Sequence, residues 1–476
     1  MATVKILNHH FRTPFIFLLF LESVLLFGSV YIGEYLRFDE ISWQPQETNL
    51  ENFPLRALIY GLVMLLGMIA MGQYQTPSTH GMHYFPLIVV KILISLTIGV
   101  IGLVILYYLF PDILLGRGLF ALSVASSFFV LVFGRLVFHH TVDGRSLRRK
   151  ILVLGAGRIA AKLLDSENNS RALIPRHASY RIHGFIASDG ELAEVPEQYR
   201  VRPGDELRAY CEAYEIDEIV LAIEDRRNKM PLEQLLDCKL SNINIIDFVD
   251  FWEREKSMLR LDMMNPSWLI FCDGYKRGAF SQFLSRLFDI TVSLTLLILM
   301  MPVLLITAVL IFIESGFKGP IFYTQTRVGL NGKQFKLLKF RSMIVDAEKE
   351  GSPQWAKSND ARVTRIGKFI RKVRIDELPQ VINIFNGDMS IVGPRPERPE
   401  FVAELEQKIP FYSARHRVKP GLAGWAQLKY PYGATEEDSY NKLEFDLYYV
   451  KNQSLIMDML VLLQTVEVVV LGKGAR

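Results

Sequence analysis

Four long apolar runs occupy the first third of this 476-residue chain and constrain its fold more than any other feature. They cover residues 14–33, 55–72, 85–109 and 119–138, each close to the ~20 residues that a helix needs to cross a bilayer. Hydrophobic residues make up 50% of the chain and the mean hydropathy is +0.20, which is too high for a soluble enzyme or a disordered chain. The sequence therefore predicts a membrane protein with large polar parts, in which residues 1–145 form a four-helix transmembrane bundle.

The placement of lysine and arginine predicts how this bundle is oriented. The loop after the first run is acidic, whereas basic residues lie before the first run and after the fourth: Lys5, Arg12, Arg145, Arg148, Arg149 and Lys150. An even number of spans returns the chain to its starting side, so both ends of the bundle are expected in the cytoplasm. Glu22 and Lys91 lie inside the runs, where ionisable residues are candidate functional groups. Lys91 is near enough to the cytoplasmic end for snorkelling to be the alternative.

After the bundle, the pattern changes to short strands separated by polar helical stretches. Residues 151–160 run from an apolar strand through the turn glycines Gly155 and Gly157 into a helix, a variant of the dinucleotide-binding fingerprint. Further strand-like runs follow at 181–187, 218–223 and 243–248. This alternation predicts an α/β, Rossmann-like domain of CoA- or nucleotide-binding type over residues 146–275. The motif alone leaves open whether Gly155 and Gly157 bind a nucleotide or the domain has a structural or regulatory role.

The next apolar run, 290–313, is long enough for a fifth span, but two features oppose a crossing. Pro302 lies at its centre, where proline removes a backbone donor and kinks a helix. Basic residues also flank the run on both sides, from Lys276 to Arg286 and from Lys318 to Lys336, so a crossing helix would place one basic cluster outside. We therefore expect a re-entrant helix over about 286–314 that breaks at Pro302 and returns to the cytoplasmic side.

A strongly basic region follows. Residues 318–375 contain 14 lysines and arginines against 4 acidic residues. Within this region, apolar and basic residues alternate at helical spacing: Val363, Ile366, Phe369, Ile370 and Val373, with Arg365, Lys368, Arg371 and Lys372 between them. This pattern is typical of a helix on an anionic membrane surface, although the solvated face of a core helix would also produce it.

Two adjacent carboxylates, Asp376 and Glu377, stand at the edge of this basic region. Neighbouring cations lower the pKa of carboxylates, so both are expected to be ionised at pH 7. One could attack a phosphorus atom while the other holds Mg²⁺ through oxygen ligation. The loop-like stretch 387–399 that follows contains Arg395 and Arg398, which can bind phosphate through two donors each.

Motifs spread in order over residues 280–475 closely resemble the bacterial sugar transferase family, the monotopic phosphoglycosyl transferases. These motifs are Arg286-Leu-Phe-Asp289, Gly319-Pro320, Gln325-Thr-Arg327-Val-Gly329, Lys339-Phe-Arg341-Ser-Met343, Asp376-Glu-Leu-Pro-Gln380, Gly387-Asp-Met-Ser390, Gly393-Pro-Arg-Pro-Glu397, Lys419-Pro-Gly-Leu-Ala-Gly-Trp425 and Gly472-Lys-Gly-Ala475. With four spans and a nucleotide-binding-like domain ahead of them, the chain resembles the large, exopolysaccharide-associated branch. The resemblance implies an α-rich catalytic domain over 276–476.

The resemblance also implies a reaction. Asp376 would attack a UDP-sugar, release UMP and carry a sugar phosphate that polyprenyl (undecaprenyl) phosphate then accepts, as the first membrane step of exopolysaccharide biosynthesis. Glu377 would hold Mg²⁺, and Arg341, Arg395, Lys339 and Arg327 would contact phosphate or nucleotide. The family often has Ser-Pro at the helix break, whereas this chain has Met301-Pro302. The implied location is the bacterial inner membrane, with the Rossmann-like and catalytic domains in the cytoplasm.

Two other functions would suit parts of this sequence. A membrane-anchored, NAD-dependent nucleotide-sugar dehydratase or epimerase would need a complete cofactor fold and a Tyr-x-x-x-Lys pair, which this chain lacks. A polysaccharide-assembly scaffold would leave the Asp376-Glu377 pair unexplained. Expected partners are a UDP-sugar, polyprenyl phosphate and membrane lipid, and no nucleic acid. The sequence leaves open which sugar is transferred, whether the protein forms a homodimer and whether it contacts downstream glycosyltransferases.

The last apolar stretch, 454–471, contains charges, and this pattern predicts an interfacial or core helix.

Overall fold

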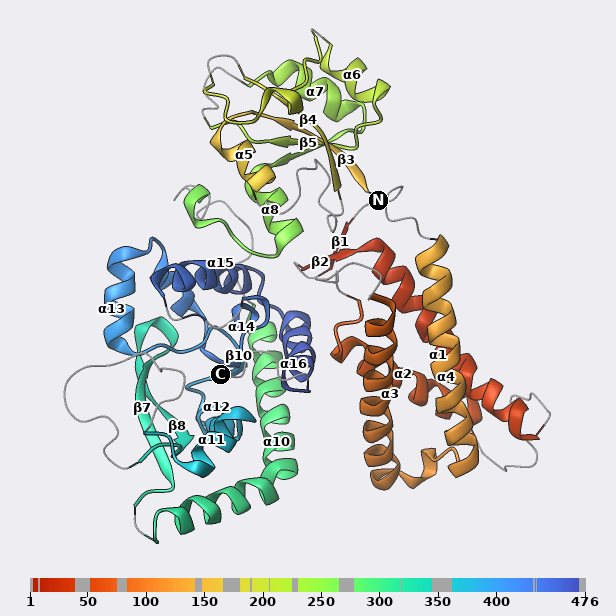
Figure 1. The fold of residues 1–476 in the computed structure, drawn as a ribbon, viewed down its shortest axis with the longest axis vertical. Coiled ribbons are helices and arrows are strands. Elements are labelled where there is room, and N and C mark those ends of the chain that lie inside the picture. Colours follow the sequence, from red (N-terminus) through yellow and green to blue (C-terminus); the bar gives the residue numbers. More distant parts are fainter. Residues whose placement is uncertain are drawn as a thin grey trace. The chain divides into compact units, whose positions relative to one another are not determined.

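The structure is a computed structural model that describes residues 3–6, 9–38, 52–74, 84–141, 148–165, 180–188, 191–204, 206–224, 230–264, 278–317, 319–344, 362–430, 433 and 435–470 (Figure 1). Several predicted features lie outside these residues: Arg145, Lys276, Lys318 and the closing motif at 472–475. The chain divides into two compact units. The first consists mainly of His10–Leu65 and Tyr74–Ser257, and the second mainly of Met258–Arg476.

Four long apolar helices form at the four predicted runs. They are α1 (Thr13–Phe38), α2 (Phe53–Ala70), α3 (Tyr84–Leu109) and α4 (Arg117–Thr141), preceded by the short strands β1 (Thr3–Ile6) and β2 (His9–Arg12). A single 3₁₀ turn, η1 (Pro111–Ile113), joins α3 to α4. Each helix is long and apolar enough to cross a membrane. The prediction of several membrane helices is therefore confirmed, while their arrangement as a four-span bundle with cytoplasmic ends stays a prediction.

A buried ion pair joins α1 to α4. Arg135 Nε lies 2.6 Å from Glu22 Oε1, and the side chains are 8% and 1% exposed. Arg135 Nη2 donates to Glu22 Oε2 at 3.1 Å, and the Tyr74 hydroxyl donates to the same oxygen. Glu22 therefore has a structural partner, since a charge away from water is tolerated when it is paired and hydrogen-bonded.

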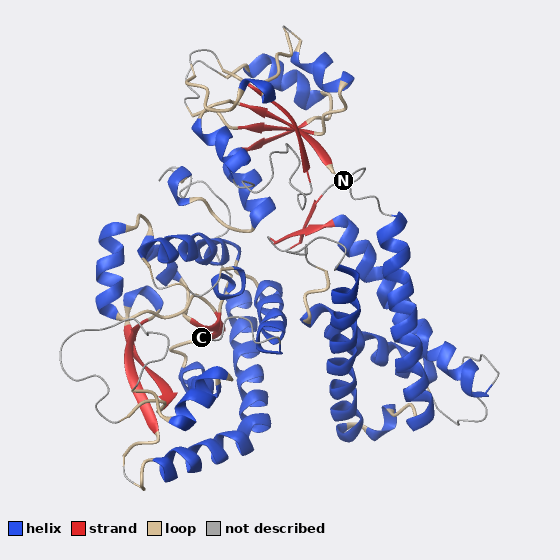
Figure 2. Ribbon diagram, in the orientation of Figure 1, coloured by secondary structure: helices blue, strands red, loops and turns tan. Residues whose placement is uncertain are grey.

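The α/β domain contains a four-stranded parallel sheet with the order β4-β3-β5-β6 (Figure 2). Its strands are β3 (Arg149–Leu154), β4 (Tyr180–Ile186), β5 (Glu218–Leu221) and β6 (Asn244–Asp247), each at a predicted position. The helices are α5 (Arg158–Asp165), α6 (Leu207–Ala213), α7 (Leu232–Leu240) and α8 (Phe248–Lys256), with the short 3₁₀ turn η2 (Glu197–Tyr199). The next turn, η3 (Leu261–Met263), belongs to the second unit. The parallel sheet is confirmed. Its first strand lies between the second and third, as in flavodoxin-type doubly wound sheets.

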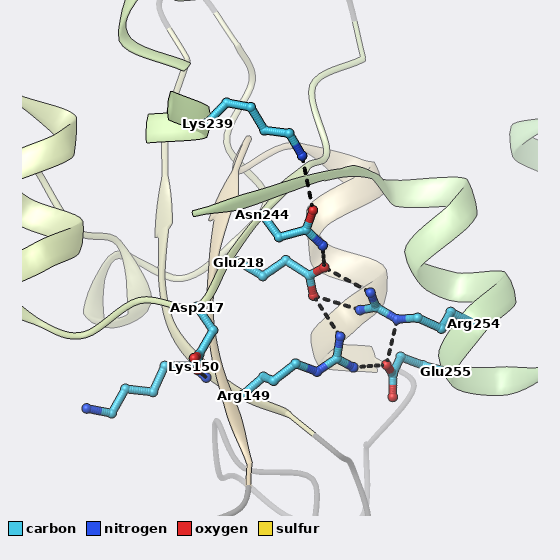
Figure 3. Close-up of polar contacts among 8 residues, drawn as sticks. All are labelled: Arg149, Lys150, Asp217, Glu218, Lys239, Asn244, Arg254 and Glu255. Carbon is cyan, nitrogen blue, oxygen red and sulfur yellow. Dashed lines mark hydrogen bonds and ion pairs between the residues drawn. The ribbon is translucent and has the colours of Figure 1, made fainter. Parts of the chain in front are cut away.

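The fully buried carboxylate of Glu218 holds together the two ends of this domain (Figure 3). Arg254 of α8 donates two hydrogen bonds to it, at 2.9 and 2.7 Å, and Arg149 of β3 donates one at 3.2 Å. Asn244 Nδ2 adds a fourth at 2.6 Å, and Glu255 bridges Arg149 and Arg254. These contacts hold Arg149, the first residue of β3, and Arg254 of α8 to the same carboxylate.

The second unit is built around a large hydrophobic core, with a smaller apolar cluster of Ile311, Phe340 and Ile370. Its elements are α10 (Ala279–Glu314), β7 (Phe322–Val328), η4 (Leu330–Gly332), β8 (Gln334–Phe340), α11 (Arg365–Lys372), η5 (Ile375–Gln380), α12 (Val381–Asn386), β9 (Ser390–Val392), α13 (Pro399–Lys408), η6 (Tyr412–Arg417), β10 (Gly421–Ala423), α14 (Trp425–Lys429), α15 (Glu436–Asn452) and α16 (Leu455–Val470). Strands β7 and β8 form an antiparallel hairpin, and β9 pairs with β10 in parallel. Met457 and Val461 of α16 are fully buried in the core, so of the two alternatives predicted for 454–471, an interfacial or a core helix, the structure shows a helix that packs in the core.

Helix α10 is bent, and both of its limbs pack against this unit (Figure 1). The predicted break at Pro302 takes the form of a proline inside one continuous helix. In the first limb, Asp289 accepts hydrogen bonds from Ser390 Oγ and the Ile391 amide, at 2.8 and 2.9 Å. In the second limb, Ile311 is buried against Phe340 and Ile370. Two points of α10 on either side of its proline therefore reach the same compact fold.

Candidate active site

The adjacent carboxylates Asp376 and Glu377 lie in the first turn of η5, directly after the basic helix α11. Arg374 takes a left-handed conformation (φ 57°) between these two elements. Its carbonyl accepts a hydrogen bond from the Glu377 amide at 3.2 Å. Both carboxylates are only 8% exposed. The turn at Arg374 thus brings the pair under the cover of the surrounding strands and loops.

Glu377 is held by cations from three segments of the chain. Its Oε1 accepts from Lys339 Nζ of β8 at 2.9 Å and from Arg395 Nη2, in the loop after β9, at 2.8 Å. Arg374 Nη1 lies 3.7 Å from Oε2. Burial opposes ionisation of Glu377, but the charges and hydrogen bonds of Arg395 and Lys339 outweigh it and hold its pKa well below the usual value. The structure therefore joins three of the predicted site residues and keeps Glu377 ionised.

Asp376 differs from its neighbour. Among the described residues, its carboxylate has no hydrogen-bond or ion-pair partner, although the charges of Lys339, Arg371 and Arg395 act on it. Burial, followed by the negative charge of Glu377, raises the pKa of Asp376 to about 6. The expectation that nearby cations lower both pKa values is correct for Glu377 and wrong for Asp376, because burial of the aspartate outweighs the cations. Asp376 is thus a buried, unengaged carboxylate that is mostly ionised at pH 7 and more basic than an ordinary aspartate.

The loop that presents Arg395 is fixed from several directions. Arg327 of β7 donates to the Pro396 carbonyl at 3.0 Å, and its other donor group reaches Gln325. Arg415 donates to the Arg395 carbonyl at 2.9 Å. Arg327, a predicted phosphate ligand, therefore lies against the loop beside Arg395 and has its Nη atoms engaged there.

Arg415 was not identified from the sequence, although it stands just before the Lys419 motif. It is buried between Asp446 of α15, at 2.8 Å, and the Tyr412 hydroxyl, to which it donates at 2.7 Å. Burial raises the pKa of Asp446 to about 6, against the lowering effect of the Arg415 charge. A small pocket borders this cluster and is lined by Arg395, Arg415 and His416 among others.

Arg341 follows β8 directly, two residues after Lys339. Its amide donates to the Ile321 carbonyl at 2.9 Å. Its buried Nη1 has no hydrogen-bond partner within the described parts of the chain. Arg341 thus remains a candidate anion ligand, while Gly155 and Gly157 belong to the first unit.

The site offers few protein ligands for Mg²⁺. Within the described ranges, no group of three or more His, Cys, Asp or Glu side chains could hold a metal ion. However, Mg²⁺ is usually bound by one or two carboxylates together with substrate phosphates. Asp376 provides an unengaged carboxylate, and Glu377 Oε2 lies 3.7 Å from Arg374 Nη1. The pair therefore fits a magnesium ion that binds together with a diphosphate.

Comparison with known proteins places these residues in a family. The family model described as bacterial sugar transferase matches residues 280–472. The chain is 40% identical over 242 residues to a UDP-N-acetylgalactosamine-undecaprenyl-phosphate N-acetylgalactosaminephosphotransferase of Aeromonas hydrophila, covering 51% of this chain and 56% of that protein. It is 37% identical over 242 residues to a UDP-glucose:undecaprenyl-phosphate glucose-1-phosphate transferase of Escherichia coli (strain K12), covering 50% of this chain and 51% of that protein.

The match therefore spans about half the length of these two relatives. It spans nearly all of a third, the exopolysaccharide production protein PSS of Rhizobium leguminosarum bv. phaseoli, with 42% identity over 189 residues that cover 38% of this chain and 93% of the relative. None of these names supports the alternative of a dehydratase or epimerase. The chain belongs to the bacterial sugar transferase family.

Proposed function

We propose that this protein is a phosphoglycosyl transferase that moves a sugar-1-phosphate from a UDP-sugar to polyprenyl phosphate and releases UMP. The observation that carries the proposal is the contrast between Asp376, an unengaged carboxylate, and Glu377, which is held by Lys339 and Arg395. The names of the relatives, which are undecaprenyl-phosphate transferases for glucose or N-acetylgalactosamine phosphate, support the substrate classes. Such a reaction is the first membrane step of exopolysaccharide biosynthesis.

In the first step, a carboxylate oxygen of Asp376 forms a bond to the β-phosphorus of the donor. The bond from that phosphorus to the bridging oxygen breaks, and UMP leaves with the electron pair. Asp376 then carries the sugar phosphate as an acyl phosphate. The cations that surround the pair, Lys339 and Arg395, stabilise the negative charge that spreads over the phosphoryl oxygens.

In the second step, a phosphate oxygen of the polyprenyl acceptor attacks the same phosphorus. The acyl-phosphate bond breaks, which restores the Asp376 carboxylate and yields a polyprenyl diphosphate sugar. Glu377 would hold Mg²⁺ together with the donor, where the metal would neutralise phosphoryl charge. Because Arg395 and Lys339 lower its pKa, Glu377 stays ionised and can hold the metal in both steps.

The lipid acceptor requires contact with the membrane, and we propose that α10 provides it as a re-entrant helix. A straight helix of 36 residues would be about 54 Å long, and crossing a hydrocarbon core of ~30 Å would separate its ends. Instead, Arg286 donates to the carbonyls of Ile384 and Phe385 at one end, and Glu314 accepts from the Ile366 amide at the other. Both ends of α10 therefore belong on the same side of the membrane.

The surface of α11 supports the same arrangement. Ile370 is buried in the fold, whereas Phe369 is 61% exposed beside Lys368 and Lys372. Exposed apolar side chains also cover α10, including Leu305, Ile306 and Val309. An exposed aromatic ring among lysines suits the interface between anionic head groups and acyl chains. Such a surface would place the nearby carboxylates at the inner leaflet, where a soluble donor meets a lipid acceptor.

A product assay tests this function. Purified protein with Mg²⁺, a UDP-sugar and undecaprenyl phosphate should release UMP, and Asp376→Asn should abolish the release. Asp262→Asn is the matched control, because Asp262 pairs with Arg260 at the surface of the same unit and should keep full activity. Release of UDP would contradict the reaction class, and undiminished UMP release by Asp376→Asn would contradict the nucleophile.

A further inference from the structure

The glycine turn of the α/β domain lies where doubly wound sheets usually bind ligands. Strand β3 ends at Leu154, between β4 and β5, and α5 begins at Arg158. In such sheets, the crevice at the carboxyl end of the strand where the order reverses receives the ligand, with its phosphate at the helix N-terminus. Gly155 has φ +124°, and a Cβ there would lie 2.5 Å from the Ala222 carbonyl oxygen. Its backbone therefore packs directly against the end of β5.

In this turn, a carboxylate of the chain itself occupies the position where the phosphate of a ligand would bind, which we call the anion position. Glu191, in the segment after β4, accepts a hydrogen bond from the Ala156 amide at 2.9 Å and a longer one from the Ser188 amide at 3.3 Å, both at Oε2. The segment that carries it is tied to the same turn, because the amides of Glu194 and Val195 donate to the Ala156 carbonyl at 2.9 and 3.0 Å. Both backbone polar groups of Ala156 are thus used within the chain.

Glu191 also fills the space in front of the second glycine. In dinucleotide-binding folds this glycine lets the backbone approach the pyrophosphate, so the space before it must be open. Here a Cβ built on Gly157 would lie 2.6 Å from Glu191 Oε1 and 3.2 Å from Cγ and Cδ. Oε1 itself is buried and has no hydrogen-bond partner within the described residues. A phosphate group hydrogen-bonded to this turn would overlap the glutamate.

We propose that Glu191 is an internal ligand that occupies the anion position of the glycine turn and closes it to nucleotide phosphates. The turn glycines are then explained by close packing: Gly155 against β5, and Gly157 against the carboxylate of Glu191. The α/β domain accordingly works without a dinucleotide at Gly155 and Gly157. This inference does not depend on the proposed transferase reaction, which concerns the second unit.

A double-mutant cycle tests the contact. Gly157 is not among the glycines with a positive φ, and the three heavy atoms nearest to a Cβ built on it all belong to Glu191, so Gly157→Ala tests this contact. In the full-length protein, Gly157→Ala should lower the midpoint of thermal unfolding when Glu191 is present. It should lower the midpoint much less, or raise it, in the Glu191→Ala background. Equal shifts in the two backgrounds would overturn the proposal.

A binding experiment tests the consequence. Hydrogen exchange of the peptide over 151–164 is followed in the full-length protein with and without NAD⁺, a dinucleotide outside the proposed reaction. The exchange rate of this peptide should not change, whatever happens elsewhere in the protein. Protection of the peptide by NAD⁺ in the protein with Glu191 intact would show that the turn is open and would overturn the proposal. ADP in place of NAD⁺ provides the same test for a single diphosphate.

Discussion

The guanidinium of Arg415 supports the backbone of Arg395, donating to its carbonyl oxygen at 2.9 Å. Arg395 in turn donates from its side chain to Glu377 at 2.8 Å. Arg415 is fixed from its other side by Asp446 at 2.8 Å. A buried ion pair thus positions the loop whose arginine holds Glu377, without itself contacting the two adjacent carboxylates.

This relationship predicts the effect of a charge-conserving change. Arg415→Lys keeps the positive charge but cannot serve Asp446, Tyr412 and the Arg395 carbonyl together. A hydrogen bond to a charged group contributes ~1.5–3 kcal/mol, so the rate of UMP release should fall roughly ten- to hundredfold, mostly in kcat. Arg417→Lys, at an exposed neighbour, is the matched control and should leave the rate unchanged. An unaltered rate in a folded Arg415→Lys protein would argue against a positioning role.

The pKa of Asp376 predicts a pH profile. The nucleophile must be ionised, and burial with the Glu377 charge raises the pKa of Asp376 to about 6. The single-turnover rate of UMP release should therefore fall about tenfold per pH unit below this value and level off above it. Lys339→Met removes a charge that lowers this pKa, so the inflection should move to higher pH. The control Lys336→Met, at an exposed position on the same strand, should keep the original inflection. A downward shift with Lys339→Met would contradict the account.

The path of α10 is tested by cysteine labelling in a cysteine-free background. Lys256→Cys and Lys333→Cys place exposed labels before and after α10. If α10 re-enters, a membrane-impermeant maleimide added to intact cells should label neither position. Asp112→Cys, in the exposed turn between α3 and α4, is the positive control, because it is expected outside. Labelling of Lys333→Cys from outside would restore a fifth span.

The pair of Glu22 and Arg135 predicts non-additive stability changes. Removing one member leaves the other as a buried, unpaired charge, which typically costs ~3–5 kcal/mol. Glu22→Gln and Arg135→Gln should each lower the unfolding midpoint of the purified protein. The double variant should lose less than the sum of the two, because neither charge is then left alone. Additive losses would mean that the two side chains do not interact in the folded protein.

Much of this architecture was predictable because apolar length and short-range pattern determine it. The runs at 14–33 and 85–109 became α1 and α3, and the strands of the parallel sheet formed at their predicted positions. Glu377, Lys339 and Arg395 stand in motifs that resemble those of a known family, so the three residues could be named in advance, although their contact with one another was not predicted.

The parts that were missed depend on pairing between distant residues and on burial. Glu22 and Arg135 are 113 positions apart, and nothing in either run shows that they face each other. Glu191 enters the glycine turn from 35 positions away. The raised pKa of Asp376 arises from enclosure of its carboxylate, whereas the sequence displays only the cations around it. Such properties emerge from the packed fold.

The central claim is that Asp376 carries the sugar phosphate between donor and acceptor. Its most direct test is mass spectrometry of the protein incubated with Mg²⁺ and a UDP-sugar but without polyprenyl phosphate, for each of UDP-glucose, UDP-galactose and UDP-N-acetylgalactosamine. The account predicts that the accepted donor adds one sugar phosphate to the peptide containing Asp376, with release of UMP in equal amount, and that undecaprenyl phosphate then removes it. UMP release that requires the acceptor, with no adduct on this peptide, would contradict the covalent mechanism.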